Sequence, residues 1–242
     1  MLTWDHVPPK NCGNFTATEI QSFQNSLARE DNKPRPQTSP NGHKYRTLCS
    51  GCNNELLGAK YDPALGDFVS RLKTIADSSL HLPDQVQIFC DLPAVVKSVL
   101  GHLIASKVDT HQTVFDESAC SYLLDEASSI PSNFHVYGWV YPYPKTVLLR
   151  DCVLQFDGSP TICNFIGFFP FAFFFTDPKI HLDAIYFNDL LAREDPDASS
   201  ISIPIKNAKP YGWPWHPDFS GVLFGGQGMM DSTISEPRRM SV

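Results

Sequence analysis

The chain has 242 residues, of which 42% are hydrophobic and 12% aromatic, so it can bury the core of one large domain, or of a small module and a medium one. With 19% charged residues and a net charge of −7, the composition excludes a disordered chain and a protein that coats nucleic acid through its overall charge. Residues 1–60 carry seven Lys and Arg against five Asp and Glu, which favours a phosphate-facing N-terminal region; a chance fluctuation of a few charges is the alternative.

The first part of the chain alternates between helical and extended patterns. Thr16 and Glu19 have the spacing of a capping box, which predicts a helix over 16–29. After a loop rich in Pro and Asn, we expect a strand over 44–48, a helix from Asn53 and another from Asp62. These elements form a predicted module at 1–78.

A second, strand-rich α+β region is predicted at 79–225, followed by a flexible tail at 226–242. We expect this acidic region to select a protein partner or the substrate. Helices are expected over 92–105 and 116–128. Strands are expected over 86–89, 135–140, 146–150, 152–156 and 201–205. His102 lies within an apolar stretch, so we interpret it as a core residue with its hydrogen bonds satisfied.

An apolar run at 165–175 is too short for a membrane span and contains Pro170, so we expect one or two buried strands there. The N-terminus has neither the basic nor the apolar segment of a secretory signal, and the number of cysteines is odd, at seven. Both features favour a reducing compartment, and the expected location is cytoplasmic, without a membrane partner.

Two short motifs carry the candidate chemistry. The first is the pair Asp5-His6, which joins a hard oxygen ligand for Mg²⁺ or Mn²⁺ to a side chain that can act as a base near neutral pH. Adjacent side chains on a strand point to opposite faces. The pair can therefore serve one site only if the backbone bends there, or if one residue acts through the other.

The second motif is Cys49-x-x-Cys52-Asn53, whose spacing lets a tight turn present two thiolates to one Zn²⁺. A structural zinc site needs four ligands, and Cys12 and His43 are the nearest candidates to add to the two thiolates. Lys10, Lys44 and Arg46 are the candidate contacts to nucleic acid.

The two motifs together resemble the HNH endonucleases, the ββα-metal group, in a branch associated with bacteria and phages; the resemblance covers about residues 4–70. It implies an N-terminal ββα-metal, treble-clef-like module and a DNA-cutting hydrolase. It further implies that His6 is the general base and that Asp5 and Asn53 bind a catalytic Mg²⁺, Mn²⁺ or Ni²⁺.

The sequence departs from this family in two places. Family members with this knuckle usually have another Cys-x-x-Cys before the Asp-His pair, and the Asn that orients the base has only Asn41 and His43 as near matches. Two alternatives to the nuclease therefore stay open. One is a zinc-knuckle module that binds nucleic acid or protein without catalysis, and the other is a subunit of a phage-defence type of complex.

Overall fold

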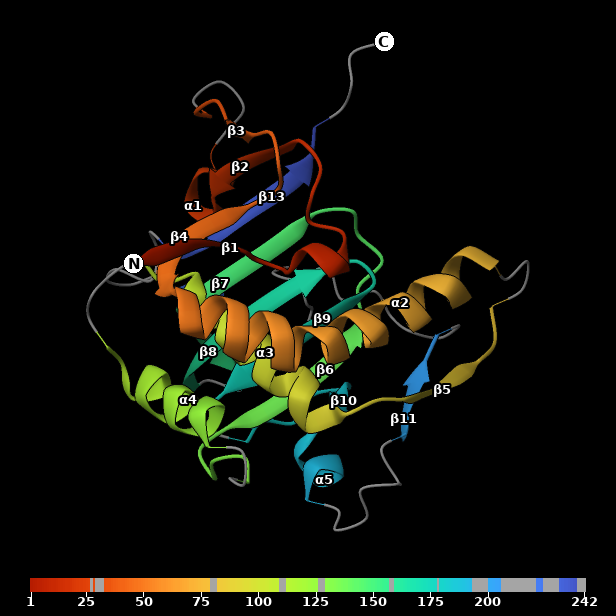
Figure 1. The fold of residues 1–242 in the computed structure, drawn as a ribbon. Helices are drawn as coiled ribbons and strands as arrows, with labels where there is room; N and C mark the ends of the chain where they lie inside the picture. The colour runs from red at the N-terminus through yellow and green to blue at the C-terminus, as the bar shows by residue number, and fades with distance from the viewer. Residues whose placement is uncertain are drawn as a thin grey trace.

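A computed structural model describes residues 1–26, 28, 33–78, 82–108, 112–125, 129–156, 159–177, 179–192, 200–205, 221–223 and 231–238. The fold belongs to the α+β class, as predicted, because helices and an antiparallel sheet occupy separate layers (Figure 1).

Within the described residues, the main sheet has nine strands in the order β10-β6-β9-β8-β7-β13-β2-β3, with β12 also paired to β7. All of its strand pairs are antiparallel. The strands are β2 (Thr18–Ser22), β3 (Gln37–Ser39), β6 (His135–Val140), β7 (Thr146–Phe156), β8 (Ser159–Phe168), β9 (Phe171–Thr176), β10 (Ile185–Tyr186), β12 (Gly221–Leu223) and β13 (Thr233–Pro237).

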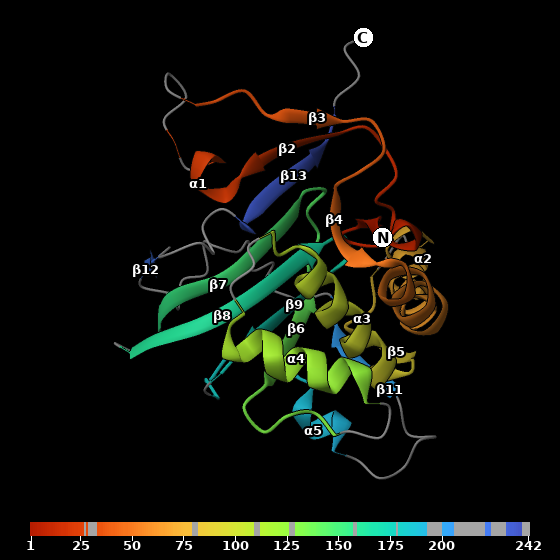
Figure 2. The same cartoon turned by 60° about the vertical axis from the view of Figure 1, so that its left-hand side comes forward.

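Helices cover one face of this sheet (Figures 1 and 2). They are the π-helix η3 (Gly51–Tyr61), α2 (Asp62–Ser78), α3 (Leu92–Ala105) and α4 (Val114–Leu124). The helix α3 begins where the sequence predicts, since the Asp91 carboxylate accepts the Ala94 N–H at 3.0 Å and a proline occupies the first turn. The structure also has three short helical turns among the described residues, which are η1 (Lys10–Cys12), α1 (Phe23–Ser26) and α5 (Asn188–Leu191).

The apolar run at 165–175 forms the last part of β8 and nearly all of β9, which confirms the prediction of buried strands. Side chains alternate between two hydrophobic clusters, with Phe173 and Phe175 on the helix-covered face and Phe174 on the other. Within the described residues, no helix is long and apolar enough to cross a membrane.

Two further antiparallel pairs lie outside the main sheet. The first joins β1 (Leu2–His6) to β4 (Lys44–Cys49), and the second joins β5 (Gln85–Phe89) to β11 (Ser200–Pro204). Figure 2 shows β4 running directly into η3. The resemblance implies two antiparallel strands followed directly by a helix. In the chain, β2, α1 and β3 lie between β1 and β4, so the ββα-metal module stays a prediction.

The predicted helix over 16–29 is wrong in its first half, where the chain forms β2. This strand pairs with β13 on one side and β3 on the other, so its backbone bonds are made across strands. Only the four residues of α1 are helical, and residues 27 and 29 lie outside the described part. Pairing with distant strands outweighs the local capping signal.

The predicted tail at 226–242 is also wrong for part of its length, because β13 lies inside the sheet between β7 and β2. The predicted boundary near residue 78 is not a break in packing. Phe68 of α2 contacts Phe171 of β9, with ring centroids 5.1 Å apart, and both belong to one hydrophobic cluster.

Candidate functional site on the β1–β4 pair

The strand β1 places Asp5 and His6 on opposite faces. Asp5 pairs with Tyr45 and His6 with Lys44, in consecutive register, and the irregularity in β1 comes earlier, between Thr3 and Asp5. The backbone therefore alternates normally at this pair. Asp5 is 5% exposed and faces inward, whereas His6 is partly exposed.

On the inner face, Asp5 belongs to a buried ion-pair network centred on His102. Nδ1 of His102 lies 2.9 Å from Oδ2 of Asp5, and Nε2 lies 2.9 Å from Oδ1 of Asp62. The hydroxyl of Ser98 also donates to Oδ1 of Asp62, at 2.7 Å. His102 is therefore a buried residue with its hydrogen bonds satisfied, as predicted.

His102 holds a positive charge in this network. Burial alone lowers the pKa of a histidine, but the charges of Asp5 and Asp62 outweigh it and raise the pKa of His102 to about 10. An imidazolium donates from both ring nitrogens, which matches its two carboxylate partners. The position depends on Gly101, since a Cβ there would lie 2.2 Å from Cδ2 of Leu57 and keep α3 away from η3.

On the outer face, His6 has the properties of a neutral base. Its Nε2 lies 3.0 Å from the backbone oxygen of Asn41. Because a carbonyl only accepts, Nε2 carries the proton and Nδ1 keeps its lone pair. Partial burial and the positive charges of Lys10 and Lys44 lower the pKa of His6 below its usual value.

The same outer face carries aromatic and basic side chains. Trp4 is 60% exposed, and the Lys44 ammonium lies 5.7 Å from the centre of its ring. Arg46 is exposed and its Nε donates to the backbone oxygen of Leu2 at 3.3 Å. We call Trp4, His6, Lys44 and Arg46 the outer β1–β4 face.

Asn53 connects the start of the helix to β1. Its Nδ2 donates to Oγ1 of Thr3 at 2.9 Å and to the backbone oxygen of Trp4 at 3.0 Å. In the knuckle, the N–H of Cys52 donates to Sγ of Cys49 at 3.4 Å. These contacts hold the start of η3 against β1.

Of the predicted zinc ligands, the structure brings Cys49 and Cys52 together, but Cys12 does not join them. Cys49 is exposed and Cys52 is partly exposed, while Cys12 is buried in the main hydrophobic cluster. Its side chain forms a hydrogen bond to its neighbour Asn11. His43 is also buried, and burial lowers its pKa to about 4. In the ranges that the structure describes, no three His, Cys, Asp or Glu side chains form a group that could hold a metal ion.

The predicted catalytic metal ligands also do not fit a shared site with His6. Asp5 faces the interior and binds His102, and Asn53 uses its amide nitrogen to hold β1. Of the predicted residues, the structure brings His6, Lys44 and Arg46 to one face, with the charge of Lys10 close enough to act on His6.

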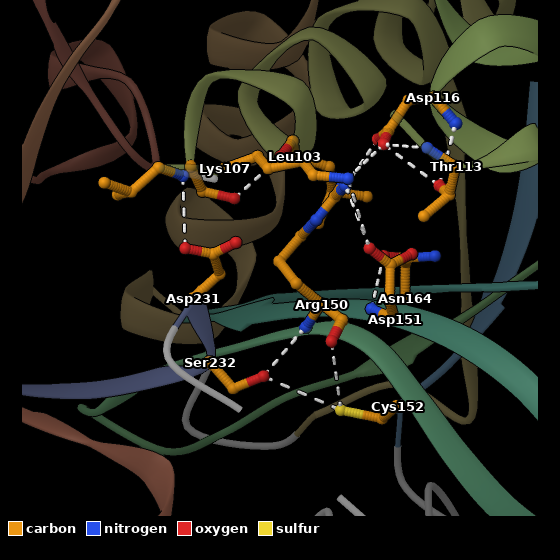
Figure 3. Close-up of polar contacts among 12 residues, drawn as sticks. Leu103, Lys107, Thr113, Asp116, Arg150, Asp151, Cys152, Asn164, Asp231 and Ser232 are labelled. Carbon is orange, nitrogen blue, oxygen red and sulfur yellow. Dashed lines mark hydrogen bonds and ion pairs between the residues drawn. The ribbon is translucent and has the colours of Figure 1, made fainter. Parts of the chain in front are cut away.

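A second polar cluster, which the sequence reasoning missed, lies between α4 and β7 (Figure 3). Arg150 is fully buried, and its Nη2 lies 2.6 Å from Oδ1 of Asp116. The other oxygen of Asp116 accepts bonds from Lys107 and from the backbone and hydroxyl of Thr113. Burial raises the pKa of Asp116, but Arg150 and Lys107 lower it to about 2.

The signal for this cluster was present in the sequence as the charged pair Arg150-Asp151 inside an otherwise apolar strand. Buried charges persist only when they are paired. The partner Asp116 lies 34 positions away, on a helix. The pairing therefore could not be assigned from the sequence.

Comparisons with protein-family models, with curated proteins and with solved structures gave no match.

Proposed function

We propose that this protein acts on nucleic acid at the outer β1–β4 face, as a phosphodiester-cleaving endonuclease with His6 as the general base and with DNA as the favoured substrate. The observation that carries the proposal is the state of His6. The ring is neutral, its tautomer is set by the backbone oxygen of Asn41, and two lysines lie close enough to lower its pKa.

A neutral imidazole with a free Nδ1 can take a proton from an attacking water. The new phosphorus–oxygen bond then forms as the bond to the leaving sugar oxygen breaks, and the leaving oxygen takes a proton from solvent water. The charges of Lys10 and Lys44 stabilise the negative charge that grows on the phosphate oxygens. A general base of this kind contributes about 10²- to 10⁴-fold to a rate.

The outer β1–β4 face also has the chemistry of a nucleic-acid contact. Lys44 and Arg46 can bind backbone phosphates, and the exposed ring of Trp4 can stack on a base. The net charge of −7 requires this binding to be local. Affinity then comes from this face and not from the whole surface.

Nothing in the proposed chemistry runs through a metal ion, because Asp5 and Asn53 do not fit the site of His6. A bound divalent cation would supply further neutralisation of the phosphate. The proposal leaves its ligands unassigned, and the divalent dependence of cleavage is measured directly in the experiment below.

A second candidate function is binding to nucleic acid without cleavage. The observation that favours it is the use of Asp5 and Asn53 by the fold, since both predicted metal ligands are engaged in hydrogen bonds within the protein. In this case His6 contributes to binding and transfers no proton.

A cleavage assay separates the two functions. Supercoiled plasmid and single-stranded RNA are incubated with the full chain and EDTA, Mg²⁺, Mn²⁺ or Ni²⁺, and DNA binding is measured in parallel. Cleavage that His6→Ala reduces at least about 100-fold, and that His181→Ala leaves intact, supports the nuclease. The exposed His181 is the matched control. Binding without cleavage in any condition supports the second candidate, and the absence of both rejects the two proposals.

A further inference from the structure

A pocket of about 400 Å³ lies beside the Arg150 cluster, away from the outer β1–β4 face. It is bounded by the start of α4 and by strands β7, β8 and β9. Most of its walls are apolar. The lining side chains that matter for binding are Phe115, Phe134, Phe175, Asp151, Asn164 and Asp177.

Three packed phenylalanine rings form an aromatic wall at this pocket, in which Phe115 is partly exposed and Phe134 and Phe175 support it from the core. The ring centroid of Phe115 lies 4.9 Å from that of Phe134 and 6.2 Å from that of Phe175, the latter in an edge-to-face arrangement. The rim is apolar too, because Val114 is 74% exposed and Ile162 is 52% exposed. Such walls bind an aromatic or aliphatic body. The Arg150 guanidinium lies 5.5 Å from the centre of the Phe115 ring, on the protein side of this wall.

Asp151 gives the pocket its main polar group, and its backbone is held in an unfavourable conformation. Its φ is 46°, in the left-handed region. This residue lies where the register between β7 and β8 is interrupted, between Leu149 and Cys152. Its N–H donates to Oδ1 of Asn164 at 3.0 Å. Strain of this kind persists where surrounding contacts impose it, and it is concentrated at functional sites.

The carboxylate of Asp151 is incompletely paired. Oδ2 lies 3.6 Å from Nη2 of Arg150 and 3.7 Å from Nζ of Lys107, beyond ordinary hydrogen-bond length. Within the described part of the chain, Oδ1 is buried without a hydrogen-bond partner. A buried acceptor without a donor is costly. The Asp151 side chain as a whole is 18% exposed and lines the pocket, so a donor in the pocket can approach this incompletely paired carboxylate.

The surrounding charges favour a positively charged donor. Asp116 makes the short contacts to both Arg150 and Lys107, so these two cations are compensated mainly there. The carboxylate of Asp151 balances the remaining positive charge of Arg150 and Lys107, and Asp177 adds a further negative charge at the pocket. Arg150 also has Nε and Nη1 without partners among the described residues, but its guanidinium is fully buried and does not line the pocket.

We propose that this pocket binds a small organic cation, whose protonated nitrogen donates to Asp151 and whose apolar or aromatic body packs against Phe115, Val114 and Ile162. The site is separate from the one proposed for nucleic acid, and the inference does not depend on that function. The ligand class follows from an acceptor-only carboxylate, an aromatic wall and an excess negative charge.

Calorimetry with three probes of similar shape tests this on the full chain: 2-phenylethylamine, 2-phenylethanol and 3-phenylpropionate. These are a cation, a neutral molecule and an anion at pH 7. The cation is expected to bind at least about tenfold more tightly than the neutral probe, because hydrogen bonds between charged groups are the stronger ones. Equal binding of the two, tighter binding of the anion, or no binding of any probe overturns the proposal.

Asp151→Asn is the decisive variant, since asparagine tolerates the left-handed conformation better than most residues and so preserves the backbone. It is expected to reduce the affinity for the cation to that of the neutral probe. Asp189→Asn, at an exposed position on α5, is the matched control. If Asp151→Asn fails to fold, Val153→Phe fills the pocket instead; it must abolish binding, and retained binding rejects the site.

Discussion

Asp5 and His6 are adjacent in the chain, but their side chains lie on opposite faces of β1 and serve different purposes. The carboxylate of Asp5 is 2.9 Å from Nδ1 of the buried His102, while Nε2 of His6 is 3.0 Å from the backbone oxygen of Asn41 at the surface. The motif that suggests one active site is therefore divided between the core and the outer β1–β4 face.

Asp5→Ala should destabilise the fold. The change leaves the positive charge of His102 with one carboxylate in place of two, and breaking one side of a buried ion pair costs about 3–5 kcal/mol. Urea unfolding measures the loss. His6→Ala is the control and should change the free energy of unfolding by less than about 0.5 kcal/mol, as surface substitutions usually do. Similar values for the two variants would contradict the structural role of Asp5.

Stability should decrease as the pH rises above about 6.5. The charges of Asp5 and Asp62, acting against burial, raise the pKa of His102 from 6.5 to about 10. A pKa raised in the folded state means that folding favours the protonated form. The stabilisation is therefore complete below pH 6.5 and is lost progressively as the pH approaches 10.

Asp62 gives stability the opposite pH dependence, with a loss at low pH. Burial raises the pKa of Asp62, but the charge and hydrogen bond of His102 outweigh burial and lower this pKa below 3.8. The contribution of Asp62 to the free energy of unfolding is therefore present above pH 3.8 and is lost as the solution becomes more acidic. Urea unfolding of the wild type and of His102→Gln between pH 3 and 10 checks both limits. The decline between pH 6.5 and 10 should be absent in the variant, and its persistence would show that another group causes it.

DNA binding should depend strongly on salt. If Lys10, Lys44 and Arg46 each neutralise one phosphate, the slope of log affinity against log salt is about −2.7, which is a loss of roughly 40-fold between about 50 and 200 mM salt. Lys44→Ala should reduce the slope by about 0.9. Fluorescence anisotropy with a labelled duplex measures both quantities. Lys179→Ala is the control, because Lys179 lies over Tyr186 of β10, outside the outer β1–β4 face. An equal effect from this control would place the binding surface elsewhere.

Asp116→Ala should be among the most damaging single substitutions in the chain. It removes the short contacts of Arg150 and Lys107 and leaves a fully buried guanidinium without its main partner, which costs about 3–5 kcal/mol. Thermal and urea unfolding measure this. Asp67→Ala is the comparison, since the ion pair of Asp67 with Arg71 is about half exposed and contributes little.

Several elements could be predicted because their signals are local. The helix α3 follows a capping aspartate and a proline, and β8 and β9 follow from a long apolar run interrupted by Pro170. The burial of His102 could also be predicted from its apolar neighbours. In each case the information lies within one or two turns of chain, or within one strand.

Tertiary structure alone decided the rest, because the stabilising partners are far apart in sequence. Thr18–Ser22 is a strand since Thr233–Pro237 lies beside it, more than 200 positions later. His102 is charged because two aspartates, 97 and 40 positions away, enclose it. The sequence by itself determined the α+β class and the residue types of the β1–β4 motif. Only the pairing of β1 with β4 and the packing of α3 decided that Asp5 faces inward and His6 outward. The physical reason is that a strand presents neighbouring side chains to opposite faces, and only one of these two faces packs against the core.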